Sequence, residues 1–503
     1  MVKLHAEHIA KTAKIIREEL PGVKFWLCSD NLHAAEPHVA RWCGVDVALS
    51  DDVVDVHNHM PYYAGTRYFD DMAYCIAKLK KPYLPLIDPA ERQLNFYRQY
   101  SAPKIEQNIV ATAALGGIGI GFWVDDVMPG EYYHAIARGF EKVSKAEPYY
   151  FEGKRCKEDI SVKPKNVISR KLPNGKEISY PDFSQTLRFT AHKLNGKYLV
   201  TVFNYDETRD LIAEVSGKDL KPFLVKVEPG SVVLAGTDFM PEQKVLEKEA
   251  AVFSGDASIF RDHISGKAKA NWSANSSGLP VLQITDGILT AGVDAFNSSH
   301  AVSLQNAEGA ELLTQGFCGR IIFADQLQPK LIFKRTAHGI AGDGTPYVTA
   351  EAEVGPYDGA NSDPNPLYRL KIERKFEVSG GKLVISHRFS NPTGNVMPLK
   401  LRIGNFPWPG HRFDADKVTL NGKTFNKDQT FSKPEWNGGE IRLQADNGVL
   451  KESIVFEPDA KFTGFYSWVL NGKTPRKTVE FLIDQPLKPH ETAEYRYSVI
   501  PEK

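Results

Sequence analysis

The feature that most constrains this 503-residue chain is a change of hydrophobic pattern along its length. From residue 1 to about 152, helical stretches alternate with short apolar runs, a pattern typical of α/β units. Further on, short strand-like runs separated by Asn-Gly and Pro-Gly turns take over, and no helical pattern remains after about residue 251. We therefore predict a multidomain α/β plus all-β protein, divided at residues 1–152, 153–250 and 251–503.

Length and charge exclude several classes of protein. At roughly 150 residues per domain the length agrees with three domains, and 62 Lys+Arg balance 62 Asp+Glu. This neutrality argues against a broad surface for nucleic acid or for an anionic membrane. No apolar run approaches the roughly 20 residues that span a bilayer, and the first residues lack the apolar region of a signal peptide. We expect a cytoplasmic protein, or a periplasmic or secreted one if an N-terminal portion is missing.

The five cysteines show no CxxC spacing. An odd number without such spacing predicts reduced thiols rather than a disulfide framework or a zinc site. We therefore expect no cofactor and no structural metal.

The α/β region can be divided into successive units. Helices are predicted at 4–20, from Glu36, and at 67–80, 90–115 and 129–146; strands are predicted at 23–30, 53–63, 81–88 and 116–126, the first of them buried. Four strand–helix units in succession predict parallel strands with right-handed crossovers.

Polar residues follow each of these strands at its carboxyl end. They are Asp30, then His57 with Asn58 and His59, then Asp88, then Asp125 with Asp126. A single carboxylate in this position is commonly a helix cap or a turn former. Four such positions in register predict a functional site, because ligands bind at this edge of parallel α/β sheets.

The segments DVVDVHNHMPYY, KKPYLPLID and QNIVATAALGGIGIGFWVDD resemble the last four units of a glycoside-hydrolase (β/α)8 barrel of the β-galactosidase-like clan. The resemblance implies sugar contacts by His57, Asn58, His59, Tyr62, Tyr63 and Asp30, and a catalytic nucleophile at Asp88, where the clan has Glu. No room for four earlier strands exists before residue 23. The resemblance thus implies the C-terminal part of a longer enzyme, a partial barrel of about four βα units completed by another chain, or an inactive relative.

Glycoside hydrolysis requires two carboxyl groups, about 5 to 5.5 Å apart for retention and about 6.5 to 9.5 Å apart for inversion. Asp88 is our candidate nucleophile or base, and Asp125 or Asp126 is the candidate partner from the adjacent strand. Trp123, Tyr62 and Tyr63 are candidates to stack on sugar rings of an oligo- or polysaccharide. Trp26 lies in the middle of its strand and is expected to be a core residue.

Asp55-Val-His57-Asn-His59 also permits a metal-dependent hydrolase. Its spacing matches the D-x-H-x-H strand motif of the amidohydrolases, and side chains two residues apart on a strand share a face. Further ligands are needed, and only His134 follows within the α/β region, inside a predicted helix. Hydrogen bonds to sugar hydroxyls, or packing, are the favoured roles for the two histidines.

The all-β regions carry two further resemblances. Residues 186–236 look like the small β-sandwich that follows many glycosidase barrels. The segments ERKFEVSGGKLVISHRFSNPT, PLKLRIGNFPWPG and PLKPHETAEYRYSV resemble a galactose-mutarotase-like supersandwich.

Catalytic mutarotases need a histidine acid and a glutamate base. His387 or His411 is a candidate acid and Glu457 a candidate base, but none lies in a matching motif; Glu491 is expected to be structural, and Trp408 is either a sugar platform or a buried residue. We expect this last region to be a sugar-associated domain without catalysis.

Three functions remain open at this point. The first is a glycoside hydrolase or its C-terminal portion, the second a non-catalytic carbohydrate-binding or assembly subunit, and the third a metal-dependent hydrolase. An open edge of parallel strands is unfavourable, so we also expect a homo-oligomer or a companion chain against residues 1–60.

Overall fold

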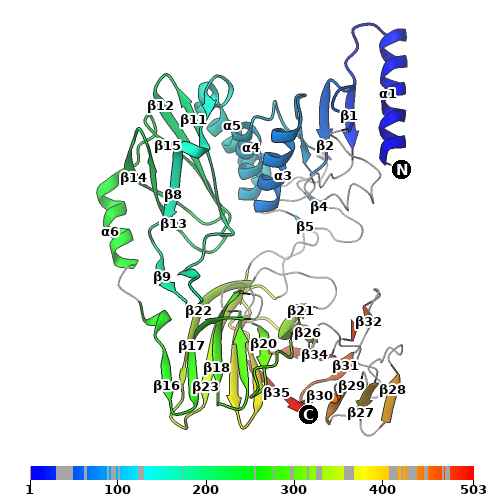
Figure 1. The fold of residues 1–503 in the computed structure, drawn as a ribbon, viewed down its shortest axis with the longest axis vertical. Helices are drawn as coiled ribbons and strands as arrows, with labels where there is room; N and C mark the ends of the chain where they lie inside the picture. Colours follow the sequence, from blue (N-terminus) through cyan, green and yellow to red (C-terminus); the bar gives the residue numbers. More distant parts are fainter. Residues whose placement is uncertain are drawn as a thin grey trace. The chain divides into compact units, whose positions relative to one another are not determined.

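A computed structural model gives the fold of the chain (Figure 1). It describes residues 2–29, 49–61, 65–87, 90–91, 98–99, 102–122, 130–172, 174–253, 257–275, 278–294, 300–313, 316–323, 331–355, 367–406, 417–420, 423–426, 439–446, 451–466, 469–470, 476–477 and 479–502. Most of the described secondary structure is β-sheet. Two compact units are formed, the first by residues 1–167 and 181–255, the second by residues 168–180, 256–358 and 362–503.

The helices of the first unit agree with most of the predicted ranges. They are α1 (Val2–Glu19), α3 (Thr66–Lys78), α4 (Ala102–Leu115), α5 (Gly130–Phe151) and α6 (Gln243–Phe253), with a 3-10 turn at Lys157–Asp159. The helices expected at 4–20, 67–80 and 129–146 are confirmed, and the one expected from Glu36 lies outside the described residues.

The helix expected at 90–115 was predicted to begin too early. Strands β4 (Ala90–Glu91) and β5 (Arg98–Gln99) pair antiparallel within that range, and α4 begins only at Ala102. Pro103 explains the later start, because proline has no amide hydrogen and is tolerated in the first turn of a helix rather than in its interior.

The strands of the α/β region are parallel, as predicted. They are β1 (Trp26–Ser29), β2 (Val56–His59), β3 (Leu86–Ile87) and β6 (Gly121–Phe122). Strand β1 pairs with β2, and β3 pairs with β6. A parallel bridge from His57 to Tyr83 links β2 to the segment that leads into β3, so the strands lie side by side in chain order.

The prediction of a buried first strand was wrong. Trp26 is 51% exposed, and Cys28 is exposed as well. Both share a face of the sheet with Val56 and Asn58, whereas Tyr83, on the opposite face, packs in one cluster with residues of α3 and α4. Trp26 thus lies on the face of the sheet away from Tyr83 and this cluster, and its indole is partly in solvent.

The rest of the first unit is antiparallel. Its strands are β7 (Lys154–Arg155), β8 (Ile160–Pro164), β11 (Leu187–Leu194), β12 (Lys197–Asn204), β13 (Leu211–Gly217), β14 (Leu220–Val227) and β15 (Val232–Gly236). They form two sheets, in the orders β15-β12-β11-β7 and β14-β13-β8. Asn195 and Gly196 join β11 to β12 with positive φ angles of 49° and 80°, the conformation that the Asn-Gly pair favours.

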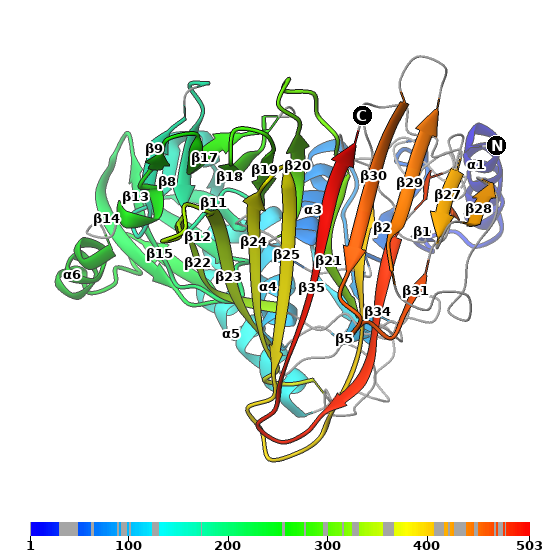
Figure 2. The same ribbon diagram turned by 90° about the horizontal axis from the view of Figure 1, so that it is seen from below.

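Most strands in the described part of the second unit belong to two nine-stranded antiparallel sheets (Figure 2). The first has the order β16 (His263–Ser265), β17 (Ala268–Ala274), β18 (Pro280–Thr285), β19 (Thr290–Val293), β20 (Ala301–Gln305), β21 (Phe317–Phe323), β26 (Met397–Phe406), β34 (Val479–Leu487), β31 (Gly464–Tyr466). The second has the order β22 (Leu331–Ile340), β23 (Pro346–Val354), β24 (Lys371–Ser379), β25 (Lys382–Ser390), β35 (Thr492–Glu502), β30 (Lys451–Pro458), β29 (Ile441–Asp446), β27 (Lys417–Leu420), β28 (Lys423–Asn426). A short pair, β32 (Val469–Leu470) with β33 (Arg476–Lys477), and a 3-10 turn at Ala257–Phe260 complete it.

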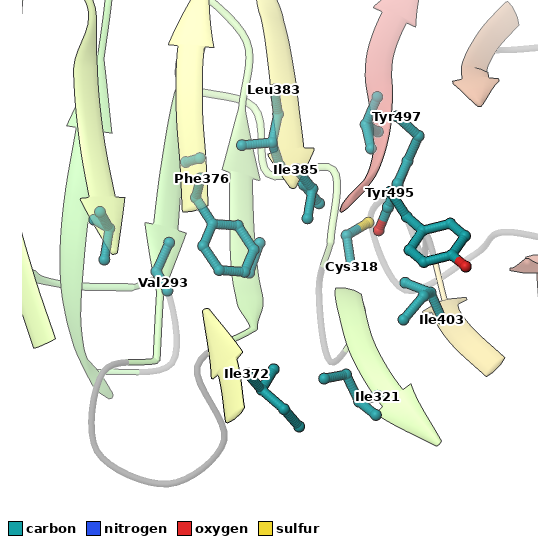
Figure 3. Packing of buried hydrophobic residues seen from close by; sticks show 14 of the residues in the cluster. Val293, Cys318, Ile321, Ile372, Phe376, Leu383, Ile385, Ile403, Tyr495 and Tyr497 are labelled. Carbon is teal, nitrogen blue, oxygen red and sulfur yellow. The ribbon is translucent and has the colours of Figure 1, made fainter. Parts of the chain in front are cut away.

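One apolar core joins the two large sheets. Phe376 and Ile385 come from one sheet, and Cys318 and Ile403 come from the other (Figure 3). Along β24 the buried positions alternate with more exposed ones, so every second side chain of this strand, Phe376 among them, points into the core.

A hairpin from the middle of the chain also belongs to this core. Strands β9 (Ile168–Lys171) and β10 (Glu177–Tyr180) pair antiparallel, and Leu172 and Ile178 lie in the core cluster of the second unit. The chain on both sides of this hairpin belongs to the first unit.

The predicted division into three domains, the partial barrel, the small β-sandwich and the supersandwich stay predictions. None of the described helices has both the length and the apolarity to cross a membrane.

Candidate functional site

The predicted site falls at the carboxyl ends of the parallel strands of the first unit. Seven of its residues lie outside the described residues, namely Asp30, Tyr62, Tyr63, Asp88, Trp123, Asp125 and Asp126. Asp30 directly follows β1, and Asp88 directly follows β3. Because these strands are parallel, the chain leaves all of them at the same edge of the sheet.

His57 is fully buried and is held by a carboxylate. Its Nε2 atom lies 2.9 Å from Oδ1 of Asp51, in the turn that precedes β2. Burial lowers the pKa of His57, and the hydrogen bond to Asp51 only partly opposes this effect. The ring is therefore neutral at pH 7 and donates its Nε2 proton to Asp51, which leaves Nδ1 unprotonated. Nδ1 has no hydrogen-bond partner within the part of the chain that the structure describes.

Asp51 organises the backbone around this histidine. Its carboxylate accepts hydrogen bonds from the backbone N–H groups of Lys80, at 2.9 Å, and Lys81, at 3.2 Å. Burial acts to raise the pKa of Asp51, but the bonds from Lys80, His57 and Lys81 outweigh it and hold the pKa below its usual value. The pair thus ties β2 to the segment that enters β3, which is a structural role for His57.

His59 lies on the same face of β2, as the spacing of two residues requires. Its ring stacks on that of His57, with 5.4 Å between centroids, and contacts the ring of Tyr83 in a tilted arrangement at 5.1 Å. Burial, followed by the proximity of His57, lowers the pKa of His59 to about 3. Both histidines thus lie on the face that packs against the helices, and contacts from them to a sugar stay a prediction.

Asn58 lies on the opposite, more open face. Its Nδ2 donates to the carbonyl oxygen of Leu84 at 2.8 Å, and its side chain is half-buried. On this face Gly119 and Gly121 present no side chains, and Leu84 and Leu86 lie against them. Asn58 is the described candidate sugar contact that combines a polar side chain with partial exposure.

The described part of the chain offers little support for a metal site at His57 and His59. No group of three or more His, Cys, Asp and Glu side chains among the described residues is arranged to hold a metal ion. Nε2 of His57 is occupied by Asp51, and His134 lies exposed on α5. The structure does not bring His134 to the two histidines of β2.

In the second unit the two described candidates, His387 and Glu457, are not brought together. His387 is fully buried in the core and stacks with Phe389 and Tyr497. Glu457 is exposed and pairs with Lys382 at 3.0 Å. Glu491 accepts the backbone N–H of Lys488 at 2.7 Å, which agrees with a structural role in the turn before β35. His411 and Trp408 lie outside the described residues.

A buried carboxylate that sequence reasoning missed is Glu480. Its exposure is 0%, and its Oε2 accepts a hydrogen bond from Arg402 at 2.8 Å. The flanking residues Val479 and Phe481 enter the core, so Glu480 lies on the other face of β34. A single acidic residue inside the apolar run VEFLI was the available sequence signal.

Comparison with known proteins gives fold-level similarities only. No protein-family model matches the chain, and no curated protein matches it. A putative aldose 1-epimerase from Escherichia coli K12 shares 11% identity over 44% of this chain and 98% of that protein, with a TM-score of 0.32. A galactose mutarotase-like protein from Clostridium acetobutylicum shares 10% identity over 46% of this chain and 98% of its own, with a TM-score of 0.31.

A third similar structure is a 4-alpha-glucanotransferase from Thermococcus litoralis, at 7% identity over 46% of this chain and 39% of that protein, with a TM-score of 0.26. The names of these neighbours are carbohydrate-related. At such low TM-scores, however, the similarities carry no argument about this chain.

Proposed function

We propose that this chain is a carbohydrate-active protein whose first unit contains part of a glycoside-hydrolase (β/α) barrel. Asp88 serves as nucleophile or base in this proposal, and Asp125 or Asp126 supplies the second carboxyl group. The small antiparallel sheets, over about 153–250, and the region from about 251 onward are accessory domains. The substrate is an oligo- or polysaccharide.

The observation that supports this proposal is the parallel pairing of β3 with β6. Leu86 pairs with Gly121 and Ile87 with Phe122, so both strands run toward the same edge in register. Asp88 is the next residue of one strand, and Asp125 follows the other by three positions. Neighbouring strands lie about 4.8 Å apart, and the two carboxyl groups of a glycosidase are separated by about 5 to 9.5 Å. Adjacent parallel strands are thus a suitable scaffold for such a pair.

The test is product release from a panel of oligosaccharides and aryl glycosides. We expect the unaltered chain to cleave at least one of these substrates. In Asp88→Asn the rate of cleavage should fall by at least about a thousandfold. Asp52→Asn is the matched control, because the Asp52 side chain is 83% exposed and lies in the turn before β2. The anomer of the first product then distinguishes retention from inversion. A folded chain that binds but does not cleave any of these sugars would refute the hydrolase and favour the binding or assembly subunit.

A partner chain is the second part of the proposal. We propose that a second copy of the chain covers the open face of β1, because Trp26 is 51% exposed and Cys28 is exposed beside it. Light scattering of the purified chain at several concentrations tests this. A dimer that Trp26→Lys dissociates supports it, and a monomer at all concentrations contradicts it.

Glu480 provides a second candidate function, the interconversion of sugar anomers in the second unit. A fully buried carboxylate bonded to a partly exposed arginine is a suitable general base once a sugar displaces the arginine. Polarimetry of α-D-glucose with the chain, with Glu480→Gln and with the exposed control Glu457→Gln would test it. Mutarotation at the spontaneous rate would exclude this function.

A further inference from the structure

The core of the second unit contains a cation next to a histidine. Arg374 of β24 is 2% exposed and His387 of β25 is 0% exposed, and the two are direct cross-strand partners. Among the described residues, neither ring nitrogen of His387 has a hydrogen-bond partner. An imidazole without such partners pays the full cost of losing water if it becomes charged.

The other described groups that surround this imidazole carry no negative charge at pH 7 that would compensate a positive one. On its other side β35 contributes Tyr495, its register partner, and Tyr497, whose ring lies 6.4 Å away. From the facing sheet come Cys318, beside Tyr497 (Figure 3), and Asn405, whose Oδ1 accepts the Tyr497 hydroxyl at 2.7 Å. Burial raises the pKa of both Tyr497 and Cys318, so each stays neutral at pH 7.

The charge states of the central pair follow from the same surroundings. Burial lowers the pKa of Arg374 to about 9, so its guanidinium is still charged at neutral pH. Burial, and then the nearby Arg374, hold the pKa of His387 well below its ordinary value of 6.5. A proton on His387 would therefore place two positive charges side by side in a desolvated interior.

We propose that the His387–Arg374 pair makes the second unit acid-sensitive, so that the core shared by its two sheets opens when the pH falls below the ordinary range of histidine. The unfolded chain binds a proton at His387 that the folded core excludes. The stability that neutral His387 contributes is fully present above the unfolded pKa of 6.5 and is lost as the pH falls toward the folded pKa. Within that window the unfolding equilibrium constant rises about tenfold per pH unit because of this one residue.

The experiment is urea unfolding of the full chain between pH 7.5 and pH 5.0. Pulsed hydrogen exchange, read by mass spectrometry in peptides covering β24 and β25, reports the opening of this core specifically. His387→Phe removes the titrating group and keeps an aromatic ring between Phe389 and Tyr497. His490→Asn is the control, because His490 is exposed in the same unit and asparagine tolerates its φ of 59°.

In the unaltered chain and in His490→Asn, we expect the unfolding equilibrium constant to rise with each unit of falling pH by about ten times the factor seen in His387→Phe. Equal pH dependence in all three proteins would overturn the proposal. If His387→Phe does not fold, the ring nitrogen resonances of the unaltered chain, labelled with 15N-histidine, decide the question. A His387 signal that remains neutral down to pH 5.5 in folded protein supports the proposal, and one that titrates near pH 6.5 without unfolding overturns it.

Discussion

The Nε2 atom of His57 lies 2.9 Å from Oδ1 of Asp51 inside the first unit, and this contact connects a strand to the turn that precedes it. Asp51 also accepts the backbone N–H groups of Lys80 and Lys81. One carboxylate therefore connects three segments of the chain, namely its own turn, strand β2 and the segment at Lys80 and Lys81 that leads toward β3.

Replacement of Asp51 by asparagine should lower the free energy of unfolding by about 1 to 3 kcal/mol, because a buried charged acceptor of several hydrogen bonds is lost. Urea denaturation at pH 7 measures this. Asp52→Asn is the neighbouring control, whose exposed pair with Lys80 should contribute less than about 0.5 kcal/mol. Equal effects of the two substitutions would show that Asp51 does not organise this region.

The hairpin at 168–180 should depend on Arg170. Its guanidinium forms two bonds to the Asp262 carboxylate, at 2.7 and 2.6 Å, and also donates to the carbonyl oxygen of Phe260. The pair is partly exposed, so we expect Arg170→Ala to destabilise the hairpin by about 1 kcal/mol. Limited proteolysis within 168–180 should then become about fivefold faster. Lys171→Ala, next in sequence and exposed, should leave the rate unchanged.

A side chain at position 319 should destabilise the second unit. It lies at a β-bulge in β21 with φ of 85°, and a Cβ atom there would approach Phe376 to 3.2 Å. Gly319→Ala should cost about 1 to 2 kcal/mol from the left-handed backbone alone. At Gly342 a Cβ atom would meet nothing within 4 Å, so Gly342→Ala should be neutral or slightly stabilising. Thermal denaturation compares the two, and similar melting temperatures would contradict this prediction.

The first unit should lose stability in mild acid. Burial lowers the pKa of His59 to about 3 and that of His192 to about 4, both below the unfolded value of 6.5. Their neutral forms stabilise the folded state above pH 6.5, and this contribution is lost as the pH falls. As the pH falls from 6.5 to 5, each of these histidines should lower the free energy of unfolding by about 2 kcal/mol.

Urea unfolding at pH 7 and pH 5, followed by hydrogen exchange in peptides of β2 and β11, measures this loss. Substitution of His59 and His192 by phenylalanine should remove most of the pH dependence. His134→Gln, at an exposed position of α5, should retain it. A pH dependence unaffected by the double substitution would rule out these two residues as its source.

Local patterns predicted much of the first unit. The helices at 66–78 and 130–151 follow apolar residues at helical spacing, and the turn at Asn195-Gly196 follows from the left-handed conformations that these residues accept. The parallel pairing of β1 with β2 also followed from the alternation of strands and helices. The helices and the turn depend on neighbours within a few residues, which the sequence contains directly, whereas the strand pairing followed from the order of the elements along the chain.

The candidate site was less accessible to such reasoning. The sequence brought His57 and His59 to one face of β2, but it did not indicate that Asp51 would occupy one of them or that the helices pack on that face. The exposure of Trp26 was predicted wrongly, and the burial of Glu480 was not predicted at all, for a related reason. Whether a side chain on a strand is covered depends on which layer lies over that face, and the strand itself does not contain this information.

By itself, the sequence determined the order of the α/β and all-β regions along the chain and the positions of most helices and turns. It also determined which polar residues follow the parallel strands. Only the tertiary structure decided that the hairpin at 168–180 joins the second core, that Arg374 and His387 meet inside it, and that Glu480 is buried with Arg402. The physical reason is the sequence separation over which each kind of interaction acts. Backbone propensities and side-chain periodicity act within a few residues, whereas burial and charge pairing depend on segments that fold together from distant parts of the chain.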